Sequence, residues 1–135
     1  MPKKLMVKEG EAVRYLENAR EILKNAVIDD HIYLDVKSVR EAFGTAYLAV
    51  LEAIKEALSK KGVTRKEMPK SVEGFMAAIQ KYLSVNNGKL VRELDRLYDS
   101  LHIAGYYRGL LTHVDTVKDE MKAAERFIKK LTGTD

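Results

Sequence analysis

Residues 92–108 hold most of the side chains that could carry out chemistry. They include an arginine, Arg96, and a histidine, His102, with five residues between them. A guanidinium can give a phosphate group two hydrogen bonds at once. An unperturbed histidine titrates at about 6.5, which suits it to proton transfer. The sequence therefore suggests phosphate binding by Arg96 and proton transfer by His102 as the candidate chemistry.

The side chains around this pair suggest an interface. Successive residues of a helix are rotated by about 100°. On this basis the buried face of the predicted helix is formed by Leu90, Leu94, Leu97 and Leu101. The outer face of the helix is then a mixture of polar, aromatic and apolar residues, formed by Arg92, Arg96, Asp99, Ile103, Tyr106 and Tyr107. Arginine and tyrosine together are typical of binding surfaces. Two interpretations remain: a binding face, or tyrosines that cap the bundle end while Arg96 lies in solvent beside Asp99.

The separation of Arg96 and His102 limits what one chain can do with them. In helical projection the two side chains lie about 120° apart. Only the reach of the side chains, or a second subunit, could bring them together. We therefore expect any joint action of this pair to depend on an oligomer.

The sequence lacks the residues that several other classes of functional site require. The chain has no cysteine, which excludes disulfides, thiolate metal sites and a cysteine nucleophile. His31, His102 and His113 do not pair on one helix, and the Glu-x-x-His signature of di-iron bundles is missing. There is also no glycine-rich phosphate loop and no Gly-x-Ser-x-Gly motif. We predict no metal and no cofactor.

Length and charge place the chain among ordinary globular domains. Its 135 residues fit one domain spanning 1–135. The 24 basic residues nearly balance 20 acidic ones, so they indicate only weak attraction to polyanions. No apolar run is long enough to cross a bilayer, and no signal-peptide pattern opens the sequence. We expect a cytoplasmic protein that does not enter a membrane.

The elements that must position these residues are helices. Apolar residues at steps of three and four predict five of them, at about residues 9–26, 36–61, 71–83, 89–106 and 114–131. No segment alternates with the period of a strand. Predicted helix caps are Asp35, Thr64 with Glu67, and Thr112 with Asp115. The fold is therefore predicted to be all-α: an antiparallel up-and-down four-helix bundle with one additional shorter helix, ordered from about 9 to 131.

Glycines and arginines add finer expectations. Gly44 lies inside the longest predicted helix, where glycine costs about 1 kcal/mol relative to alanine, so we expect a close helix crossing there. Gly105 and Gly109 bracket a tyrosine pair and should end or kink the fourth helix, and a turn is expected at Asn86-Asn87-Gly88. Arginines expected on outer faces, paired with nearby acidic residues, are Arg14, Arg20 and Arg40.

Three stretches of the sequence carry a family resemblance. They are Tyr15 to Leu23, Tyr33 to Arg40 leading to Ala46-Tyr47, and Tyr98-Asp99-Ser100-Leu101-His102 with Gly105-Tyr106-Tyr107. Over about residues 9–130 the chain resembles small helical proteins of the HEPN type, the nucleotide-binding domains of higher eukaryotes and prokaryotes. Within that group it is most similar to an uncharacterised prokaryotic subfamily.

The resemblance implies a homodimeric bundle, often with a nucleotidyltransferase-like protein partner. Some members of the HEPN group are ribonucleases with an arginine, four to six residues and a histidine, a spacing that Arg96 and His102 fit. Leu97 departs from the polar residue that often follows the arginine. The leading interpretation is therefore a non-catalytic interaction or nucleotide-binding module. The alternatives are a metal-free ribonuclease, in which His102 moves the proton and Arg96 stabilises charge on the phosphate of RNA, and a helical adaptor unrelated to nucleotides.

Overall fold

Apolar residues at helical spacing build the core of the structure, a computed structural model that describes residues 10–83 and 88–133. Its α-helices, which follow the predicted segments closely, are α1 (Glu11–Lys24), α2 (Val36–Lys60), α3 (Val72–Ala78), α4 (Lys89–Leu97) and α5 (Val114–Thr132). The predicted start of the first helix at residue 9, and residues 86–87 of the predicted turn, lie outside the described residues.

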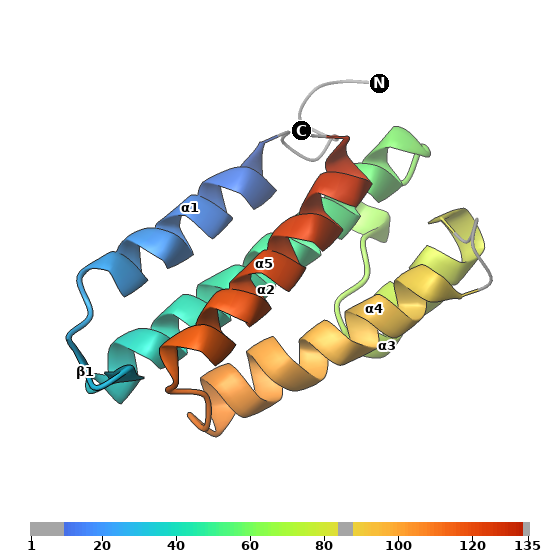
Figure 1. The fold of residues 1–135 in the computed structure, drawn as a ribbon. Coiled ribbons are helices and arrows are strands. Elements are labelled where there is room, and N and C mark those ends of the chain that lie inside the picture. Colours follow the sequence, from blue (N-terminus) through green and yellow to red (C-terminus); the bar gives the residue numbers. More distant parts are fainter. Residues whose placement is uncertain (1–9, 84–87, 134–135) are drawn as a thin grey trace.

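The second helix, α2, is the centre of the molecule. It packs against α1, α5 and the helix that continues α4. Its buried side chains include Val39, Phe43, Ala46, Val50 and Ile54. The four long helices alternate in direction along the chain, with the shorter α3 beside α4 (Figure 1). The predicted all-α class is confirmed, and this arrangement is compatible with the predicted four-helix bundle.

Two helices change their hydrogen-bonding pattern along their length. The α3 helix continues as the π-helix η3 (Ile79–Leu83), and α4 continues as the π-helix η4 (Tyr98–Tyr107). Bonds from i to i+5 widen the turn and rotate the side chains relative to a regular helix. Gly105 lies inside η4, which ends at Tyr107, one residue beyond the predicted end at about 106. Gly109, with a φ of 63°, does follow the end of η4.

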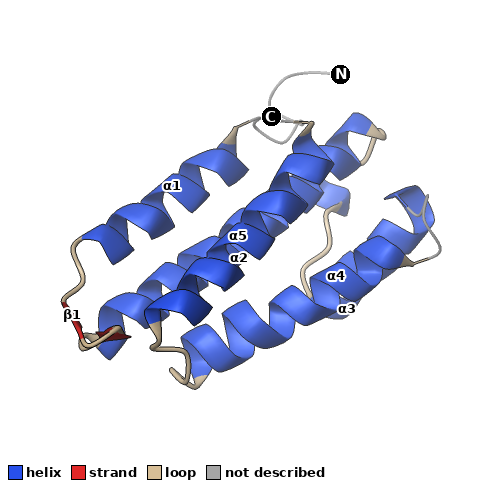
Figure 2. Cartoon of the chain, viewed as in Figure 1, coloured by secondary structure: helices blue, strands red, loops and turns tan. Residues whose placement is uncertain are grey.

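A small β-hairpin joins α1 to α2, where no strand was predicted. Its strands β1 (Ile28–Asp29) and β2 (Ile32–Tyr33) are antiparallel (Figure 2). The two residues between them have positive φ values, 49° at Asp30 and 64° at His31. Such a pair closes a two-residue hairpin turn. Strands of two residues are too short to show alternation, which is why sequence periodicity missed them.

The hairpin is hydrogen-bonded to the start of α5. The Tyr33 N–H donates to the carbonyl of Thr112 at 2.8 Å, and the Val114 N–H donates to the carbonyl of His31 at 2.9 Å. The residue before α5 is His113, and its side chain makes no capping bond. The predicted cap at Thr112 was therefore wrong, because the position that precedes the first residue of the helix is His113 and not Thr112.

Two other predicted caps are confirmed. The Asp35 carboxylate accepts a hydrogen bond from the Ser38 N–H at 3.2 Å at the start of α2. The Glu67 carboxylate accepts from the Thr64 N–H at 2.9 Å, which closes the short 3-10 helix η2 (Arg65–Glu67). Across residues 10–83 and 88–133, no helix combines the length and the apolar character that crossing a membrane requires.

Candidate functional site

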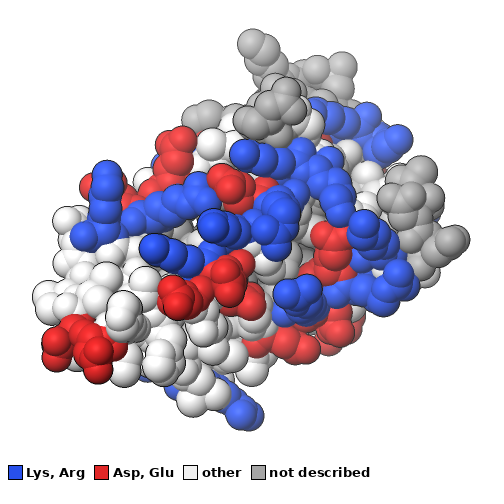
Figure 3. All heavy atoms as spheres, in the orientation of Figure 1, with Lys and Arg blue, Asp and Glu red and all other residues white. Residues whose placement is uncertain are grey.

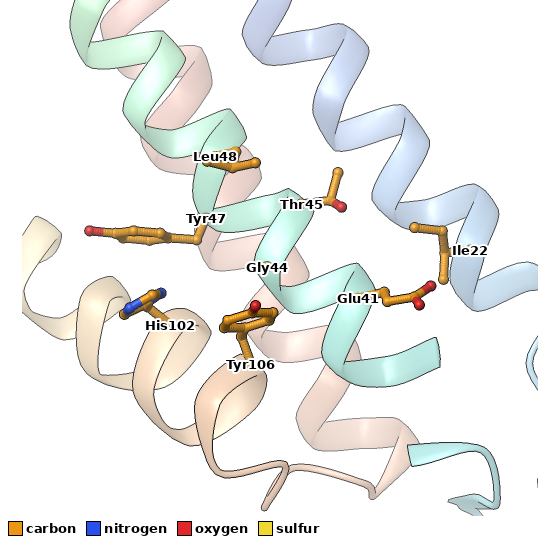
Figure 4. Close-up of a pocket in the computed structure, with 8 residues that line it drawn as sticks. All are labelled: Ile22, Glu41, Gly44, Thr45, Tyr47, Leu48, His102 and Tyr106. Atoms are coloured by element: carbon orange, nitrogen blue, oxygen red, sulfur yellow. The ribbon is translucent and has the colours of Figure 1, made fainter. Parts of the chain in front are cut away.

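Four rings from α2 and η4 pack against one another. The His102 ring lies 4.9 Å from Tyr47, 5.3 Å from Tyr98 and 5.8 Å from Tyr106, measured between ring centroids. Tyr98, His102 and Tyr106 are four residues apart on η4, so His102 is held between two tyrosines of its own helix. Tyr47 faces it from α2 (Figure 4). We call these four residues the aromatic cluster.

Two glycines let α2 and η4 approach this closely. A Cβ atom on Gly105 would lie 2.5 Å from Cγ of Phe43, and one on Gly44 would lie 2.8 Å from Cδ1 of Tyr106. Both distances are too short for a real side chain. The close crossing predicted at Gly44 is therefore confirmed, and Gly105 is the corresponding glycine on η4.

Arg40 fixes the end of η4 from α2. Its Nε donates to the Tyr106 carbonyl at 2.7 Å, and its Nη2 donates to the Tyr107 carbonyl at 3.0 Å. These are carbonyls that a helix end leaves without an intrahelical partner. The prediction that Arg40 pairs with a nearby acidic residue was wrong, because backbone oxygens of another element take its donors.

The other two arginines differ from each other. Arg14 forms the expected local pair, with Glu11 on the same helix. Arg20 instead reaches across to Glu125 of α5, with 3.0 Å between its Nη1 and the carboxylate oxygen. Spacing along one helix could indicate the first pair but not the second.

Beside the aromatic cluster lies a shallow hollow of about 530 Å³. Its lining, drawn in Figure 4, comprises Ile22, Glu41, Gly44, Thr45, Tyr47, Leu48, His102 and Tyr106. Here α1, α2 and η4 lie side by side, with α5 behind them. The lining is mostly apolar and aromatic and includes one carboxylate, Glu41, but no lysine or arginine. A phosphate group in this hollow would find no cation among these residues.

Burial controls the ionisation of one member of the cluster. Desolvation, with smaller contributions from Tyr98 and Glu73, raises the pKa of Tyr47 to about 12. The phenol of Tyr47 is therefore protonated at neutral pH. It can donate a hydrogen bond there but cannot act as a base.

The structure separates the predicted site residues. His102 and Tyr106 both line the hollow, whereas Arg96 is exposed on α4. No hydrogen bond, ion pair or ring contact joins Arg96 to His102 in the part of the chain that the structure describes. Of the remaining predicted interface residues, Ile103 is half-buried, and the exposed ones are Arg92, Asp99 and Tyr107.

The residues that sequence reasoning missed come from α2. Tyr47 and Leu48 line the hollow, but neither was selected as a site residue. Leu48 could have been found from the sequence, because it is an apolar residue that lies outside the predicted buried face of its helix. In the structure it is 52% exposed. Nothing in the sequence distinguishes Tyr47 from a core residue, because a tyrosine at the edge of the buried face of a helix is ordinary packing.

Large apolar side chains are exposed on η4 and in the segment that follows it. Tyr106 is 44% exposed, Tyr107 68% and Leu110 63%. Further exposed apolar residues in the hairpin region and at the start of α2 are Val27, Ile28, Leu34 and Val36. On the α5 face, charged side chains of both signs gather over α1 and α5, whereas the end nearest the hairpin is mostly uncharged apart from a group of acidic side chains at its tip (Figure 3). The apolar surface is therefore concentrated at one end of the molecule.

Comparison with known proteins gives a family but no activity. The model of the family described as "Domain of unknown function (DUF5618)" matches residues 7–133. A solved structure of a protein of unknown function from Dyadobacter fermentans is similar, with a TM-score of 0.73 and 28% sequence identity over 91% of this chain and 92% of that one. No curated protein matches the sequence. The chain therefore belongs to the DUF5618 family.

Proposed function

We propose that the chain is a non-catalytic, homodimeric interaction module, and that the face formed by α1, α2 and η4 binds a second copy. The observation that carries the proposal is the apolar hollow with Leu48 and Tyr106 exposed on it. Exposed apolar patches of this kind mark interaction sites, and aromatic side chains are enriched in interfaces. The HEPN-like resemblance supports the same assignment, since it implies a homodimer.

The solvent-facing stripe of α2 is self-complementary in charge. Lys37, Glu41 and Leu48 are exposed along this stripe. Glu52 follows them, with 18% of its side chain exposed and an ion pair to Lys55 at 3.0 Å. If two α2 helices crossed antiparallel near Gly44, Lys37 of one copy would face Glu52 of the partner subunit, and this pair would form twice. This charge pattern favours a second copy as the occupant of the face.

A nucleotide is the less favoured occupant. The rings of Tyr47 and Tyr106 could stack on a base, but the carboxylate of Glu41 lines the hollow and would repel phosphate. The ribonuclease alternative would need Arg96 of one copy near His102 of the partner subunit, because the two are apart within one chain. A nucleotidyltransferase-like partner remains a proposal that the resemblance alone supports.

Light scattering coupled to size-exclusion chromatography tests the dimer and its register. We expect a dimer at micromolar concentration, a shift to monomer in Lys37→Glu, and recovery of the dimer in Lys37→Glu with Glu52→Lys. The control is Lys66→Glu, which makes the same charge change at an exposed position on η2 and should leave the dimer intact. A wild-type monomer at all accessible concentrations would contradict the proposal.

The same protein preparations distinguish the alternatives. Thermal protection of a monomer by AMP would favour the nucleotide-binding module. RNA degradation that is lost in His102→Ala would favour the ribonuclease. A dimer that is unaffected by Lys37→Glu would place the interface on another face.

A further inference from the structure

A second, smaller hollow of about 230 Å³ lies between α1 and α5, next to the hairpin. Its apolar lining is formed by Leu23, Val117 and Met121, and three cationic side chains also line it: Arg20, Lys118 and Lys122. We propose that this hollow binds a small organic anion, whose apolar body contacts the three apolar side chains while its carboxylate or phosphate faces the lysines.

The two lysines supply the charge of this site. Lys118 and Lys122 are four residues apart on α5 and therefore lie on the same face of the helix. Neither forms an ion pair with another residue in the described ranges. Arg20 contributes less, because the carboxylate of Glu125 lies 3.0 Å from its guanidinium and neutralises it. An anion would thus meet two uncompensated ammonium groups.

Tyr33 gives independent support for a ligand. It lines the hollow, is only 6% exposed, and its backbone N–H is already bonded to Thr112. Its hydroxyl forms no hydrogen bond to any residue that the structure describes, and burial raises its pKa, so the hydroxyl is a protonated donor at neutral pH. Among the described residues, only Glu120 Oε2 is a fully buried side-chain polar atom without a partner, so the Tyr33 hydroxyl is open to solvent or to a ligand. A carboxylate or phosphate oxygen would accept its hydrogen bond.

Size and charge define the class of ligand. The volume of about 230 Å³ falls below the roughly 300–1,000 Å³ of sites for drug-sized ligands, which suits a single aromatic ring or a short aliphatic chain. The larger hollow beside η4 has the opposite electrostatics, because Glu41 is its charged residue. The two hollows should therefore prefer different ligands.

Benzoate, with benzamide as its neutral analogue, is a suitable probe. In NMR titrations of the full chain at millimolar ligand, benzoate should shift the Met121 methyl and Tyr33 ring resonances in a saturable way. Benzamide should bind about tenfold more weakly, because it lacks the charge that the lysines attract. Equal affinity for the two compounds, or no shift with benzoate, would overturn the proposal.

Variants separate the anion site from general attraction to a basic protein. Lys118→Gln with Lys122→Gln should weaken benzoate binding about tenfold, while the aliphatic lining is largely kept. Lys129→Gln with Lys130→Gln removes the same charge elsewhere on α5 and should have little effect. Tyr33→Phe should also weaken binding, with an unchanged melting temperature as the check on folding. Equal losses in the two lysine pairs would overturn the proposal, and none of these results depends on whether the chain dimerises.

Discussion

The crossing of α2 with η4 and the seam between α1 and α5 hold the same bundle together in different ways. At the crossing, glycines remove side-chain bulk, and neighbouring rings of the aromatic cluster lie 4.9 to 5.9 Å apart. At the seam, a hollow of about 230 Å³ remains and one ion pair, Arg20 with Glu125, bridges the helices. The two regions therefore differ in how their helices are joined: ring packing and close backbone approach join them at the crossing, and an ion pair beside a small hollow joins them at the seam.

We expect the largest loss of stability from adding a side chain where α2 and η4 cross. In Gly105→Ala the new Cβ would lie 2.5 Å from Cγ of Phe43, a fully buried ring that has little room to move. Overpacking of this kind costs about 1–3 kcal/mol, which should exceed the gain of about 1 kcal/mol in helix propensity. Urea denaturation should show the loss, and Phe43→Leu should relieve part of it in the double variant. A more stable Gly105→Ala protein would contradict the tight crossing.

Gly44→Ala is the matched comparison on the other helix. Its Cβ would meet Cδ1 of Tyr106 at 2.8 Å, but this tyrosine is 44% exposed and can swing away. We therefore expect a net change in stability within about 0.5 kcal/mol. A stability loss as large as that of Gly105→Ala would show that Tyr106 is held more firmly than its exposure indicates.

The aromatic cluster should also make stability depend on alkaline pH. Tyr47 ionises at about 12 in the folded protein and at about 10 when unfolded. The unfolded state therefore loses its proton first, and stability falls as the pH rises from 10 to 12. Between pH 9 and pH 11 the wild type should lose about 1 kcal/mol more than Tyr47→Phe. Parallel denaturation curves for the two proteins would show that the hydroxyl is not buried.

The smallest effect is expected at the seam. Arg20→Gln removes an exposed ion pair and should cost about 0.2–1 kcal/mol at neutral pH. The hydrogen bond from Arg20 lowers the pKa of Glu125, so this stabilisation is present at neutral pH and disappears as the pH falls through that lowered pKa. Denaturation at pH 7 and pH 3 measures the difference. A loss that persists at pH 3 would assign the effect to packing by the arginine stem.

Features set by local sequence were predictable. The bounds of α2 and α5 follow from apolar spacing, and the cap at Asp35 follows from a side chain that can reach its own helix start. Gly44 revealed the close crossing because a glycine is costly inside a long helix. Each of these depends on residues within a few positions of one another.

Features set by distant contacts were not predictable. The π-helical geometry of η4 rotates His102 toward Tyr47, whereas the projection assumed regular turns of about 100° per residue. Arg40 bonds to carbonyls 66 and 67 residues away, and no spacing along α2 indicates that. The candidate site was therefore half found: the sequence located His102 and Tyr106 but not the α2 residues that complete the hollow.

The hydrogen bonds between the hairpin and α5 affect how well this end of the bundle tolerates substitutions. These bonds join backbone groups, from Tyr33 to Thr112 and from Val114 to His31, so they do not depend on which side chains are present. The residue type is restricted at the two turn positions, with φ values of 49° and 64°, toward Asn, Asp or Gly, and at Tyr33, whose side chain is buried. The link to α5 should therefore keep its hydrogen bonds when the exposed hairpin residues Ile28 and Asp29 are substituted.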